Sequence, residues 1–566
     1  MKTVHSAGCM IPEPDFPATV PGLVRHFASV HGNREAIVSD GNRISFAGLD
    51  EKSARVARAL IECGAGKGSR IAILAPPSPD FVVAVLAVMR IGAIAGPLST
   101  LYQAPELAWV LSNAEFDQLI IADRFLRHDY LARLEQALPG LAEKKGPPLY
   151  LPSAPRLRQI HVIGSQSRPW STPFAKLMNG SDHVDQAMLD ELESLVVPAD
   201  PACIIHTSGS TANPKGVIHG HGPLVRHSWQ MGMGYTPFGP GDRVITTRAM
   251  FWVAGFVATL FYSLNNGACL ITTNDGSPAN VLRLIEQESG NALAGDVGWF
   301  DVLRESDELK SAGYDIVRLN MDTAGVASAG RYVSDHLAAR IGQPVHYPNS
   351  RFARTFGMTE TLGGHTSARY DELLPEDRPS WQGRAVPGVE LLIVDPETGA
   401  PLPAGETGEL LVRGYCLMQG LNGYEHHEPF DQQGYYATGD LCMLDADGYL
   451  KFEARKGEMV KIHGANVAPL EVELVMTGLM GIEKAGVVGI ESRGETRLVA
   501  AVLMAPGRTL DEVAVITELK TRLSSFKVPR HIVALDEDTL PATGSGKIKK
   551  AELAALMTSM LADNHI

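Results

Sequence analysis

The stretch RIAILAPPSPDFVVAVLAVMRIGAIAGPLS, at residues 70–99, decides the fold class of this 566-residue chain. It starts with a short apolar run containing β-branched side chains, which predicts a strand. A proline-rich turn follows, and the long apolar stretch after it predicts a helix. The run GAIAG at residues 92–96 predicts a second strand. This order of strand, helix and strand is a βαβ unit, the building block of parallel sheets that are covered by helices.

The same alternation returns in strand-like runs at residues 119–122, 159–163, 243–247 and 268–272. Beyond about residue 383, short alternating runs with turn signals predict a small β subdomain. After residue 456, mixed strands and helices are enough for a separate domain. We therefore expect an α/β fold with a large N-terminal domain, made of two α/β sheet subdomains plus a small β-barrel-like subdomain, followed by a smaller α+β C-terminal domain.

The change of sequence texture gives the domain boundaries. We expect an N-terminal domain at residues 1–454, a hinge at residues 455–457 and a C-terminal domain at residues 458–566. The length agrees, since at about 150 residues per domain it predicts three or four folding units.

Composition excludes several classes of protein. The chain is 45% apolar and 20% charged, which excludes a disordered, collagen-like or coiled-coil protein. Its 56 glycines and 36 prolines are dispersed and predict many turns. The net charge of −14 has the wrong sign for binding a phosphate backbone through counterion release. We therefore expect no nucleic-acid partner.

The cysteines and one apolar stretch bear on the cellular location. Six cysteines are scattered without a CxxC pair, so neither a zinc site nor a disulfide framework is predicted, and we expect a cytoplasmic location. The uncharged residues 250–273 are long enough to cross a bilayer. However, the turn SLNNG at residues 263–267 would leave backbone groups unsatisfied in hydrocarbon. This stretch therefore predicts a buried helix, turn and strand rather than a membrane span.

The strongest local signal for chemistry is HTSGSTANPKG at residues 206–216, directly after an apolar run at residues 202–205. Small hydroxyl residues and glycine let backbone N–H groups and hydroxyls surround an anion, and a lysine supplies a positive charge. Pro214 and Gly216 break the Walker pattern, which requires glycine before the lysine and Ser or Thr after it. By composition alone, the segment fits either a phosphate-binding loop or a flexible surface loop.

Four further segments accompany this loop. They are FGMTE at residues 356–360, YATGD at 436–440, Arg455 with KIHG at 461–464 and PLE at 469–471, and PATGSGK at 541–547. In this order and spacing, the five segments resemble the adenylate-forming superfamily of acyl-CoA synthetases, nonribosomal-peptide adenylation domains and beetle luciferases. The resemblance covers nearly the whole chain, from about Leu23 onward.

The resemblance implies a nucleotide site. Glu360 is a hard oxygen ligand suited to Mg²⁺, and the family implies that Thr207 shares this metal. Phe356 offers a flat face to adenine where the family usually has tyrosine, and Asp440 resembles the aspartate that binds the ribose hydroxyls. The implied ATP- or AMP-binding residues are Thr207, Ser208, Gly209, Ser210, Thr211, Lys215, Gly325, Phe356, Gly357, Thr359, Asp440, Arg455 and Lys547.

The resemblance also implies the catalytic groups. Lys547 resembles the family lysine that holds the carboxylate and the α-phosphate, and the implied catalytic set is Lys547, Glu360 and Thr207. In the family, a mobile C-terminal domain rotates about a hinge that here falls on Gly457, where Asp or Lys is usual. Lys461 and Gly464 are the other residues that we expect at the hinge or the coenzyme A channel.

The acyl pocket is implied at the residues Phe251, Trp252, Ala254 and Phe256. Trp252 either shortens this pocket or offers a ring face to a cyclic substrate. The segment lacks the aspartate with which family members bind an α-amino group, so an amino acid substrate is not expected. Arg351 and Arg354 either face a second substrate carboxylate or lie on a solvated loop.

The expected function is ATP-dependent activation of a carboxylic acid to an acyl-adenylate, with release of pyrophosphate, followed by transfer to coenzyme A. The expected cofactors and co-substrates are therefore ATP, Mg²⁺ and coenzyme A. One alternative is an acyl-AMP ligase that loads a carrier protein, and another is a non-catalytic nucleotide-binding protein with the same fold. The retained Lys547, Glu360, Asp440 and Arg455 argue against a pure binder. The sequence leaves the acid and the oligomeric state open, a homodimer included.

Overall fold

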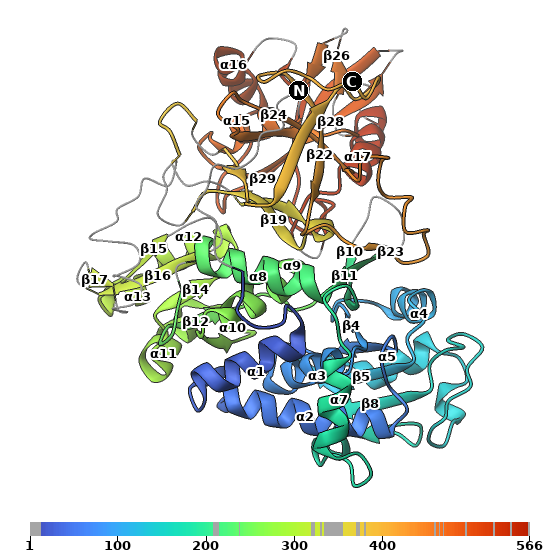
Figure 1. Ribbon diagram of the computed structural model, residues 1–566. Coiled ribbons are helices and arrows are strands. Elements are labelled where there is room, and N and C mark those ends of the chain that lie inside the picture. Colours follow the sequence, from blue (N-terminus) through green and yellow to red (C-terminus); the bar gives the residue numbers. More distant parts are fainter. Residues whose placement is uncertain are drawn as a thin grey trace. The chain divides into compact units, whose positions relative to one another are not determined.

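Helix α3 (Pro79–Arg90) is buried along almost its whole length and contacts strands of two different sheets. The computed structural model in Figure 1 describes residues 13–207, 214–236, 238–318, 323–328, 331–332, 355–369, 374–378, 381–457, 460–462, 465–467, 469–492, 495–523, 527–543 and 546–563. The Ser78 side chain caps α3 by accepting from the Phe81 N–H, and Pro79 sits in the first turn, where its missing N–H costs nothing. A helix that is apolar on all sides belongs in a core.

The predicted βαβ unit is confirmed. Strand β3 (Arg70–Leu74) precedes α3, strand β4 (Ile94–Pro97) follows it, and the two strands pair in parallel. Their sheet has the order β23-β11-β10-β4-β3-β5-β8-β9. The other strands of this sheet are β5 (Gln118–Ala122), β8 (Gln159–Ile163), β9 (Thr172–Pro173), β10 (Pro201–Thr207), β11 (Lys215–Gly220) and β23 (Gly420–Leu421).

A second sheet has the order β15-β16-β14-β12-β13-β1-β2, with β17 paired to β16. Helix α3 contacts β1 and β2 of this sheet as well as β3 and β4 of the first, so it fills the space between them. The strands are β1 (Glu35–Ser39), β2 (Asn42–Ser45), β12 (Arg243–Thr246), β13 (Cys269–Thr272), β14 (Ala292–Ala294), β15 (Tyr314–Arg318), β16 (Thr323–Ser328) and β17 (Arg331–Tyr332).

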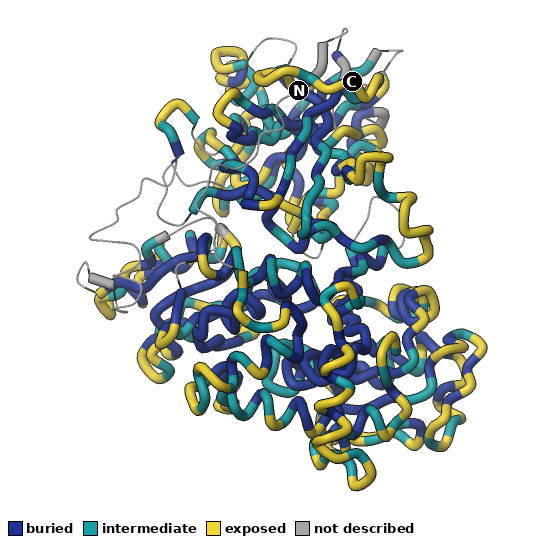
Figure 2. The backbone as a smooth tube through the Cα atoms, in the orientation of Figure 1, coloured by how far each residue is buried: buried dark blue, intermediate teal, exposed yellow. Residues whose placement is uncertain are grey.

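Figure 2 shows the strands of both sheets as the buried centre of this part of the chain. Helices and small elements complete it. The larger helices are α1 (Val20–His31), α2 (Phe46–Glu62), α4 (Ala104–Asn113), α5 (Tyr130–Ala137), α6 (Phe174–Met178), α7 (Gln186–Ser194), α8 (His221–Tyr235), α11 (Pro278–Glu288), α12 (Val297–Glu305) and α13 (Asp307–Ser311). The small elements are β6 (Arg124–Phe125), β7 (His128–Asp129), the 3-10 turns η1 (Leu141–Glu143) and η4 (Thr359–Thr361), and the sheet of β18 (Phe356–Met358), β19 (Gly363–Ser367) and β20 (Arg384–Ala385).

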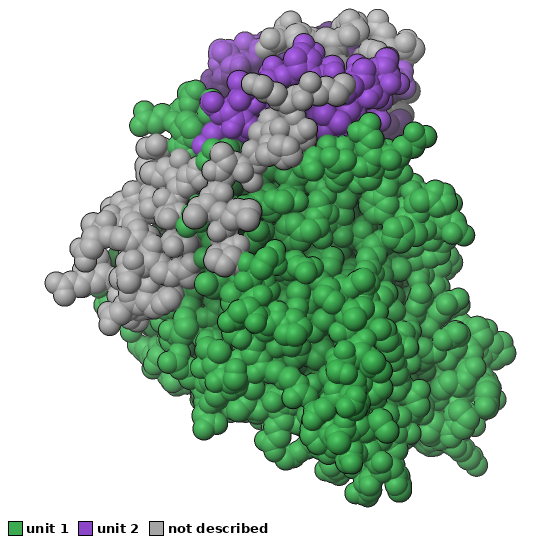
Figure 3. Space-filling view, in the orientation of Figure 1, with its two compact units in different colours: residues 1–390, 413–436 green, residues 391–412, 437–566 purple. Residues whose placement is uncertain are grey.

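The chain divides into two compact units, which Figure 3 colours separately. Unit 1 comprises residues 1–390 and 413–436, and unit 2 comprises residues 391–412 and 437–566. The predicted hinge at residues 455–457 lies within unit 2 and stays a prediction.

The first part of unit 2 is a four-stranded sheet of order β21-β22-β24-β25. Its strands are β21 (Val389–Val394), β22 (Thr407–Gly414), β24 (Tyr436–Leu444) and β25 (Leu450–Arg455), followed by the hairpin of β26 (Val460–Ile462) and β27 (Ala465–Val467). This is the small β region that the alternating runs beyond residue 383 predict.

The C-terminal part is a three-stranded sheet with helices on both faces. Strands β28 (Ile482–Ser492), β29 (Glu495–Met504) and β30 (His531–Ala534) form the sheet. Helices α15 (Pro469–Thr477) and α16 (Glu512–Arg522) share one core with Val487 and Leu498. Helix α17 (Lys550–Asp563) shares another core with the adjacent Val488 and Val499. Because successive strand residues point to opposite faces, one sheet supports both cores.

Candidate active site

The predicted phosphate loop connects two paired strands. Strand β10 ends at Thr207, strand β11 begins at Lys215, and these two residues face each other across the antiparallel pair. Both are partly buried. Of the predicted loop residues, Ser208, Gly209, Ser210 and Thr211 lie outside the described part of the chain. The hairpin therefore brings a hydroxyl and a cation together where the loop leaves and rejoins the sheet.

Glu360 lies on the 3-10 turn η4, which hydrogen bonds hold on several sides. The Thr361 hydroxyl donates to the carbonyls of Met358 and Gly363, and Leu362 N donates to Thr359 O at 3.1 Å. Met418 N donates to the Glu360 carbonyl at 2.7 Å. The Tyr436 hydroxyl donates to the Glu360 carboxylate at 3.5 Å. The backbone of the turn is thus fixed, and Glu360 is half-buried.

Gly357 lies where two backbones approach closely. An added Cβ would stand 1.7 Å from the carbonyl oxygen of Gly363 on strand β19. This explains the glycine in the FGMTE segment, because any side chain would force β18 away from β19. The neighbouring Phe356 ring is half-buried and packs edge-on against His365 at 5.4 Å between centroids. Gly325, the other residue predicted near adenine, is buried on β16 between Ala292 and Val317.

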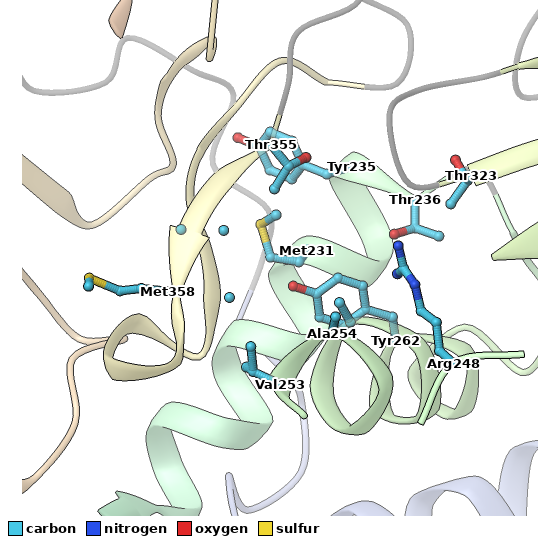
Figure 4. A pocket seen from close by; sticks show the side chains of 14 residues that line it. Met231, Tyr235, Thr236, Arg248, Val253, Ala254, Tyr262, Thr323, Thr355 and Met358 are labelled. Carbon is cyan, nitrogen blue, oxygen red and sulfur yellow. The ribbon is translucent and has the colours of Figure 1, made fainter. Parts of the chain in front are cut away.

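A cavity of about 170 Å³ opens beside this segment (Figure 4). Its wall combines methionine and tyrosine side chains with small residues and backbone. The described lining residues are Met231, Tyr235, Thr236, Arg248, Val253, Ala254, Ala258, Tyr262, Thr323, Thr355, Gly357, Met358, Gly363 and Gly364. The buried Arg248 guanidinium donates to Gly295 O at 2.8 Å and to the Thr259 hydroxyl at 3.4 Å. The wall is therefore mainly apolar, with a tethered cation at one side.

One of the four predicted acyl-pocket residues is among the described residues that line this cavity. Ala254 lines it, whereas Phe251, Trp252 and Phe256 are not among its described lining residues. Phe256 is fully buried, and Trp252 packs edge-on against Phe251 at 4.9 Å between centroids.

The stretch at residues 250–273 folds as predicted. It forms α9 (Val253–Gly255), the π-helix η2 (Phe256–Phe261), α10 (Tyr262–Asn265), a turn and strand β13. In the described part of the chain, no helix combines the length and apolarity that a bilayer crossing requires.

Asp440 and Arg455, both within unit 2, form an ion pair. They are partners across strands β24 and β25, and the distance from Asp440 Oδ1 to Arg455 Nε is 2.9 Å. Arg455 also donates to Thr438 O at 3.1 Å. Gly439 supplies the positive φ of 72° that turns the backbone just before the aspartate.

Lys547 stands at the exposed end of a closed turn within unit 2. Thr543 N donates to Lys547 O at 2.7 Å, and Lys547 N donates to the Thr543 hydroxyl at 3.1 Å. Gly546 has a positive φ of 78°, which closes this turn. The amine therefore extends from a defined backbone into solvent.

The predicted hinge residues are only partly described. Gly457 is exposed, and no described atom lies within 4 Å of an added Cβ there. Lys461 is placed in strand β26, and Gly464 lies outside the described residues.

Three buried histidines lie near one another, and one of them, His219, is hydrogen-bonded to Thr359 of the Glu360 turn. Desolvation lowers the pKa of His219 to about 4 and the pKa of His365 to about 3. Desolvation together with the neighbouring His219 and His365 lowers the pKa of His227 to about 3. These rings are therefore neutral near pH 7.

The oxygen donors predicted at this site suit a metal ion that completes its coordination shell with substrate oxygens and water. Among the described residues, no group of three or more His, Cys, Asp or Glu side chains could hold a metal ion. Mg²⁺ usually takes one or two protein oxygens and completes its shell with phosphates and water. A half-buried carboxylate at Glu360 and a hydroxyl at Thr207 are hard oxygen donors of this kind.

Sequence reasoning missed most of the cavity wall. Met231 and Tyr235 are four residues apart on α8 and so lie on one helix face. That spacing could have suggested a shared surface, but the helix around it is largely buried, and the pattern does not show which buried face borders empty space. His219 was missed too, because its partner Thr359 is 140 residues away in the chain.

Comparison with known proteins assigns the family. The sequence model of the family described as AMP-binding enzyme matches residues 24–421, and that of the AMP-binding enzyme C-terminal domain matches residues 471–547. The chain belongs to the AMP-binding enzyme family.

Relatives of this AMP-binding enzyme are acyl-CoA ligases. The chain is 29% identical over 544 residues to the mitochondrial medium-chain acyl-CoA ligase ACSF2 of Rattus norvegicus, covering 94% of this chain and 86% of that protein. It is 29% identical over 542 residues to the 3-[(3aS,4S,7aS)-7a-methyl-1,5-dioxo-octahydro-1H-inden-4-yl]propanoyl:CoA ligase of Rhodococcus jostii (strain RHA1), covering 94% of this chain and 98% of that protein.

Solved structures agree in fold. The anthranilate CoA ligase AuaEII in complex with anthranoyl-AMP has a TM-score of 0.77 at 20% identity, covering 97% of this chain and 99% of that chain. ATP-bound MatB from Rhodopseudomonas palustris has a TM-score of 0.71 at 24% identity, covering 95% and 99%. The predicted superfamily, the predicted α/β fold and the predicted AMP-forming acid–CoA ligase are confirmed.

Proposed function

We propose that this enzyme activates a carboxylic acid with a compact, mainly hydrocarbon body, of medium-chain or alicyclic type, and transfers it to coenzyme A. The observation that carries the proposal is the cavity beside Gly357, whose wall is built from Met231, Tyr235, Ala258 and Tyr262. Flexible methionine side chains and tyrosine faces suit an apolar body of irregular or ring shape. The two relatives named above act, by their names, on medium-chain acyl groups and on a bicyclic propanoate.

The phosphate end of ATP would bind at the β10–β11 hairpin. Lys215 supplies a positive charge and Thr207 a hydroxyl from facing positions on the two strands. Glu360 and Thr207 would hold Mg²⁺, which neutralises charge on the phosphates when it is bound. The chain's own contribution is to fix these groups in advance, since phosphoryl-type transfer depends on position and charge more than on a protein nucleophile.

The nucleoside end would use Phe356 and Gly325 for adenine and Asp440 for the ribose hydroxyls. Arg455 is hydrogen-bonded to Thr438 O and paired with Asp440, so it would hold that carboxylate in place toward the two hydroxyls. The exposed Lys547 would interact with the substrate carboxylate and the α-phosphate.

In the first half-reaction, an oxygen of the substrate carboxylate attacks the α-phosphorus, the bond to the β-phosphate oxygen breaks and pyrophosphate leaves. In the second, the sulfur of coenzyme A attacks the acyl carbonyl, the thiol gives up its proton and AMP leaves. We propose that rotation of the backbone at Gly457 changes the enzyme from the first step to the second, because this exposed glycine permits a wide range of backbone angles.

A substrate panel tests this proposal. Purified enzyme with ATP, Mg²⁺ and coenzyme A is given octanoate, cyclohexanecarboxylate, benzoate, acetate and malonate, and both AMP and thioester are measured. We expect octanoate or cyclohexanecarboxylate to exceed acetate and malonate at least tenfold in kcat/KM. A preference for acetate or malonate would contradict the proposed acid class. Pyrophosphate release without coenzyme A-dependent AMP release would instead indicate an acyl-AMP ligase.

We further propose a cytoplasmic location and a homodimer. The described cysteines are free thiols, and burial raises the pKa of Cys203, Cys269 and Cys416 to about 12, which makes them unreactive. Free thiols suit a reducing compartment. Cell fractionation tests the location, and light scattering of the purified enzyme distinguishes a dimer from a monomer.

A further inference from the structure

A buried histidine connects the two parts of unit 1 that carry the proposed phosphate and metal ligands. Strand β11 begins at Lys215 and carries His219 four residues later. The His219 ring donates through Nε2 to the carbonyl oxygen of Thr359 at 2.8 Å. Thr359 is the first residue of the turn η4 and directly precedes Glu360. One side chain thus joins the lysine strand to the glutamate turn.

The hydrogen bond fixes the state of the ring. A carbonyl oxygen can only accept, so Nε2 must carry the proton. His219 is fully buried, and its Nδ1 has no hydrogen-bond partner in the described part of the chain. Burying an imidazole with one nitrogen unpaired costs stability, and a leucine here would avoid that cost. The contact to Thr359 is therefore a reason to keep a histidine at this position.

Backbone contacts complete a closed circuit around Glu360. Met418 N donates to Glu360 O at 2.7 Å, and the same segment returns to β11 through Gln419 N, which donates to Ile218 O at 2.8 Å, and Asn422 N, which donates to Gly216 O at 2.8 Å. Of these described links between β11 and the Glu360 turn, the His219 bond is the one that a side chain supplies. It is therefore the link that substitution can remove without altering the backbone path.

We propose that His219 is a positioning residue that sets the place of the Glu360 carboxylate relative to Lys215 and thereby the affinity for ATP bound to Mg²⁺. The inference rests on the proposed roles of Glu360 and Lys215. Loss of the hydrogen bond from His219 to Thr359 should weaken binding of the Mg²⁺–ATP complex and leave binding of metal-free ATP unchanged.

The chain offers a matched control two residues away. His221, the first residue of helix α8, is equally buried. Its Nδ1 accepts from Val20 N at 3.2 Å, and Val20 belongs to helix α1 rather than to the Glu360 turn. Substitution of His221 by leucine therefore also replaces a buried imidazole and removes its hydrogen bond to backbone, without moving the metal ligand.

The experiment is calorimetric titration of ATP into the full-length enzyme without acid substrate, once with Mg²⁺ and once with EDTA, for the wild type and the variants His219→Leu, His219→Gln and His221→Leu. The glutamine amide nitrogen can occupy the place of Nε2 and donate to Thr359 O. We expect His219→Leu to raise the Kd for ATP with Mg²⁺ about tenfold and to leave the Kd in EDTA within twofold. His219→Gln should stay within threefold of the wild type under both conditions, and His221→Leu within twofold.

Equal weakening in Mg²⁺ and EDTA, equal effects of leucine and glutamine at position 219, or no effect of either would each overturn the inference. Thermal unfolding of every variant separates a folding defect from a binding defect, and His219→Gln remains informative if His219→Leu does not fold. Because no acid is present, the result does not depend on turnover. A wild type that binds ATP with Mg²⁺ but forms no thioester would refute the proposed function and leave this inference tested on its own.

Discussion

The buried carboxylate of Asp440 is paired with the half-exposed guanidinium of Arg455, at 2.9 Å between Oδ1 and Nε. The side chain of Asp440 is 3% exposed and that of Arg455 is 40% exposed. The pair therefore stabilises unit 2 in addition to any role toward the nucleotide, because a carboxylate removed from water needs a partner.

Removal of the arginine should harm folding, and removal of the negative charge should harm binding. We expect Arg455→Met to lower the free energy of unfolding by about 1–3 kcal/mol, since it removes a cationic partner of a buried carboxylate from a partly solvated pair. We expect Asp440→Asn to change stability by less than about 1 kcal/mol and to raise the Kd for ATP about tenfold. Thermal unfolding and calorimetry measure the two effects. Arg522→Met is the control, because its partner Glu518 is solvent-exposed. Loss of stability equal to that of this control would contradict the prediction.

The close approach at Gly357 predicts an intolerant position. With the added Cβ 1.7 Å from Gly363 O, Gly357→Ala must move strand β18 or β19. We expect at least tenfold lower carboxylate-dependent exchange of pyrophosphate into ATP. Gly439→Ala is a useful contrast, because its positive φ costs about 1 kcal/mol but no described atom lies within 4 Å of its Cβ. Activity of Gly357→Ala at or above that of Gly439→Ala would argue against a tightly fixed segment.

Substitutions at Gly457 should separate the two half-reactions. We expect Gly457→Pro to leave pyrophosphate exchange within threefold of the wild type and to reduce thioester formation at least tenfold, because proline restricts rotation at φ. Gly457→Ala should change both by less than threefold, since the site has room for a methyl group. Equal loss of both half-reactions in the proline variant would exclude a hinge at this residue.

Filling the cavity should change which acids are used. Ala258 lies on the π-helix η2 and lines the wall. We expect Ala258→Phe to lower kcat/KM for octanoate and cyclohexanecarboxylate at least tenfold, and for acetate less than twofold. The Kd for ATP provides the control and should not change. A uniform loss for all acids would show that the substitution disturbs the fold rather than the substrate.

Acid should destabilise the enzyme through its buried histidines. Desolvation is the main cause that lowers the pKa of His161, His206, His219 and His221 to about 4 and that of His227 and His365 to about 3. Below pH 6.5, the ordinary pKa of histidine, the unfolded chain binds protons that the folded chain does not. The free energy of unfolding therefore has its full value above about pH 6.5. It falls between pH 6.5 and pH 4 by about 1.4 kcal/mol per pH unit for each such group.

Urea unfolding between pH 7 and pH 5 measures this slope. We expect His365→Leu to reduce the slope of the unfolding free energy against pH by the equivalent of about one proton. The substitution removes a ring whose two nitrogens lack hydrogen-bond partners in the described structure. An unchanged slope in this variant would mean that His365 titrates in the folded enzyme.

The sequence indicated the local elements and the segments that carry charge, because these depend on neighbours in the chain. The βαβ unit around α3 and the helix, turn and strand at residues 250–273 are of this kind. The cavity wall and the His219 bond depend on contacts between distant segments, which periodicity does not encode. The grouping of residues 391–412 with the C-terminal part likewise follows from strand pairing rather than from composition.

Helix α3 has a consequence for how the protein can be divided. It contacts helices α1 and α2 as well as strands of both large sheets, so it joins β1 and β2 of one sheet to β3 and β4 of the other. Its last residue, Arg90, is anchored to Asp50 on one side and to Glu193 on the other, from segments 143 residues apart. A fragment that ends before β12 would keep the described contacts of α3 but would leave β1 without its neighbour β13, at the open edge of an incomplete sheet. The two sheets should therefore unfold in a single cooperative transition, and neither is suited to independent expression or to exchange between related enzymes as a module.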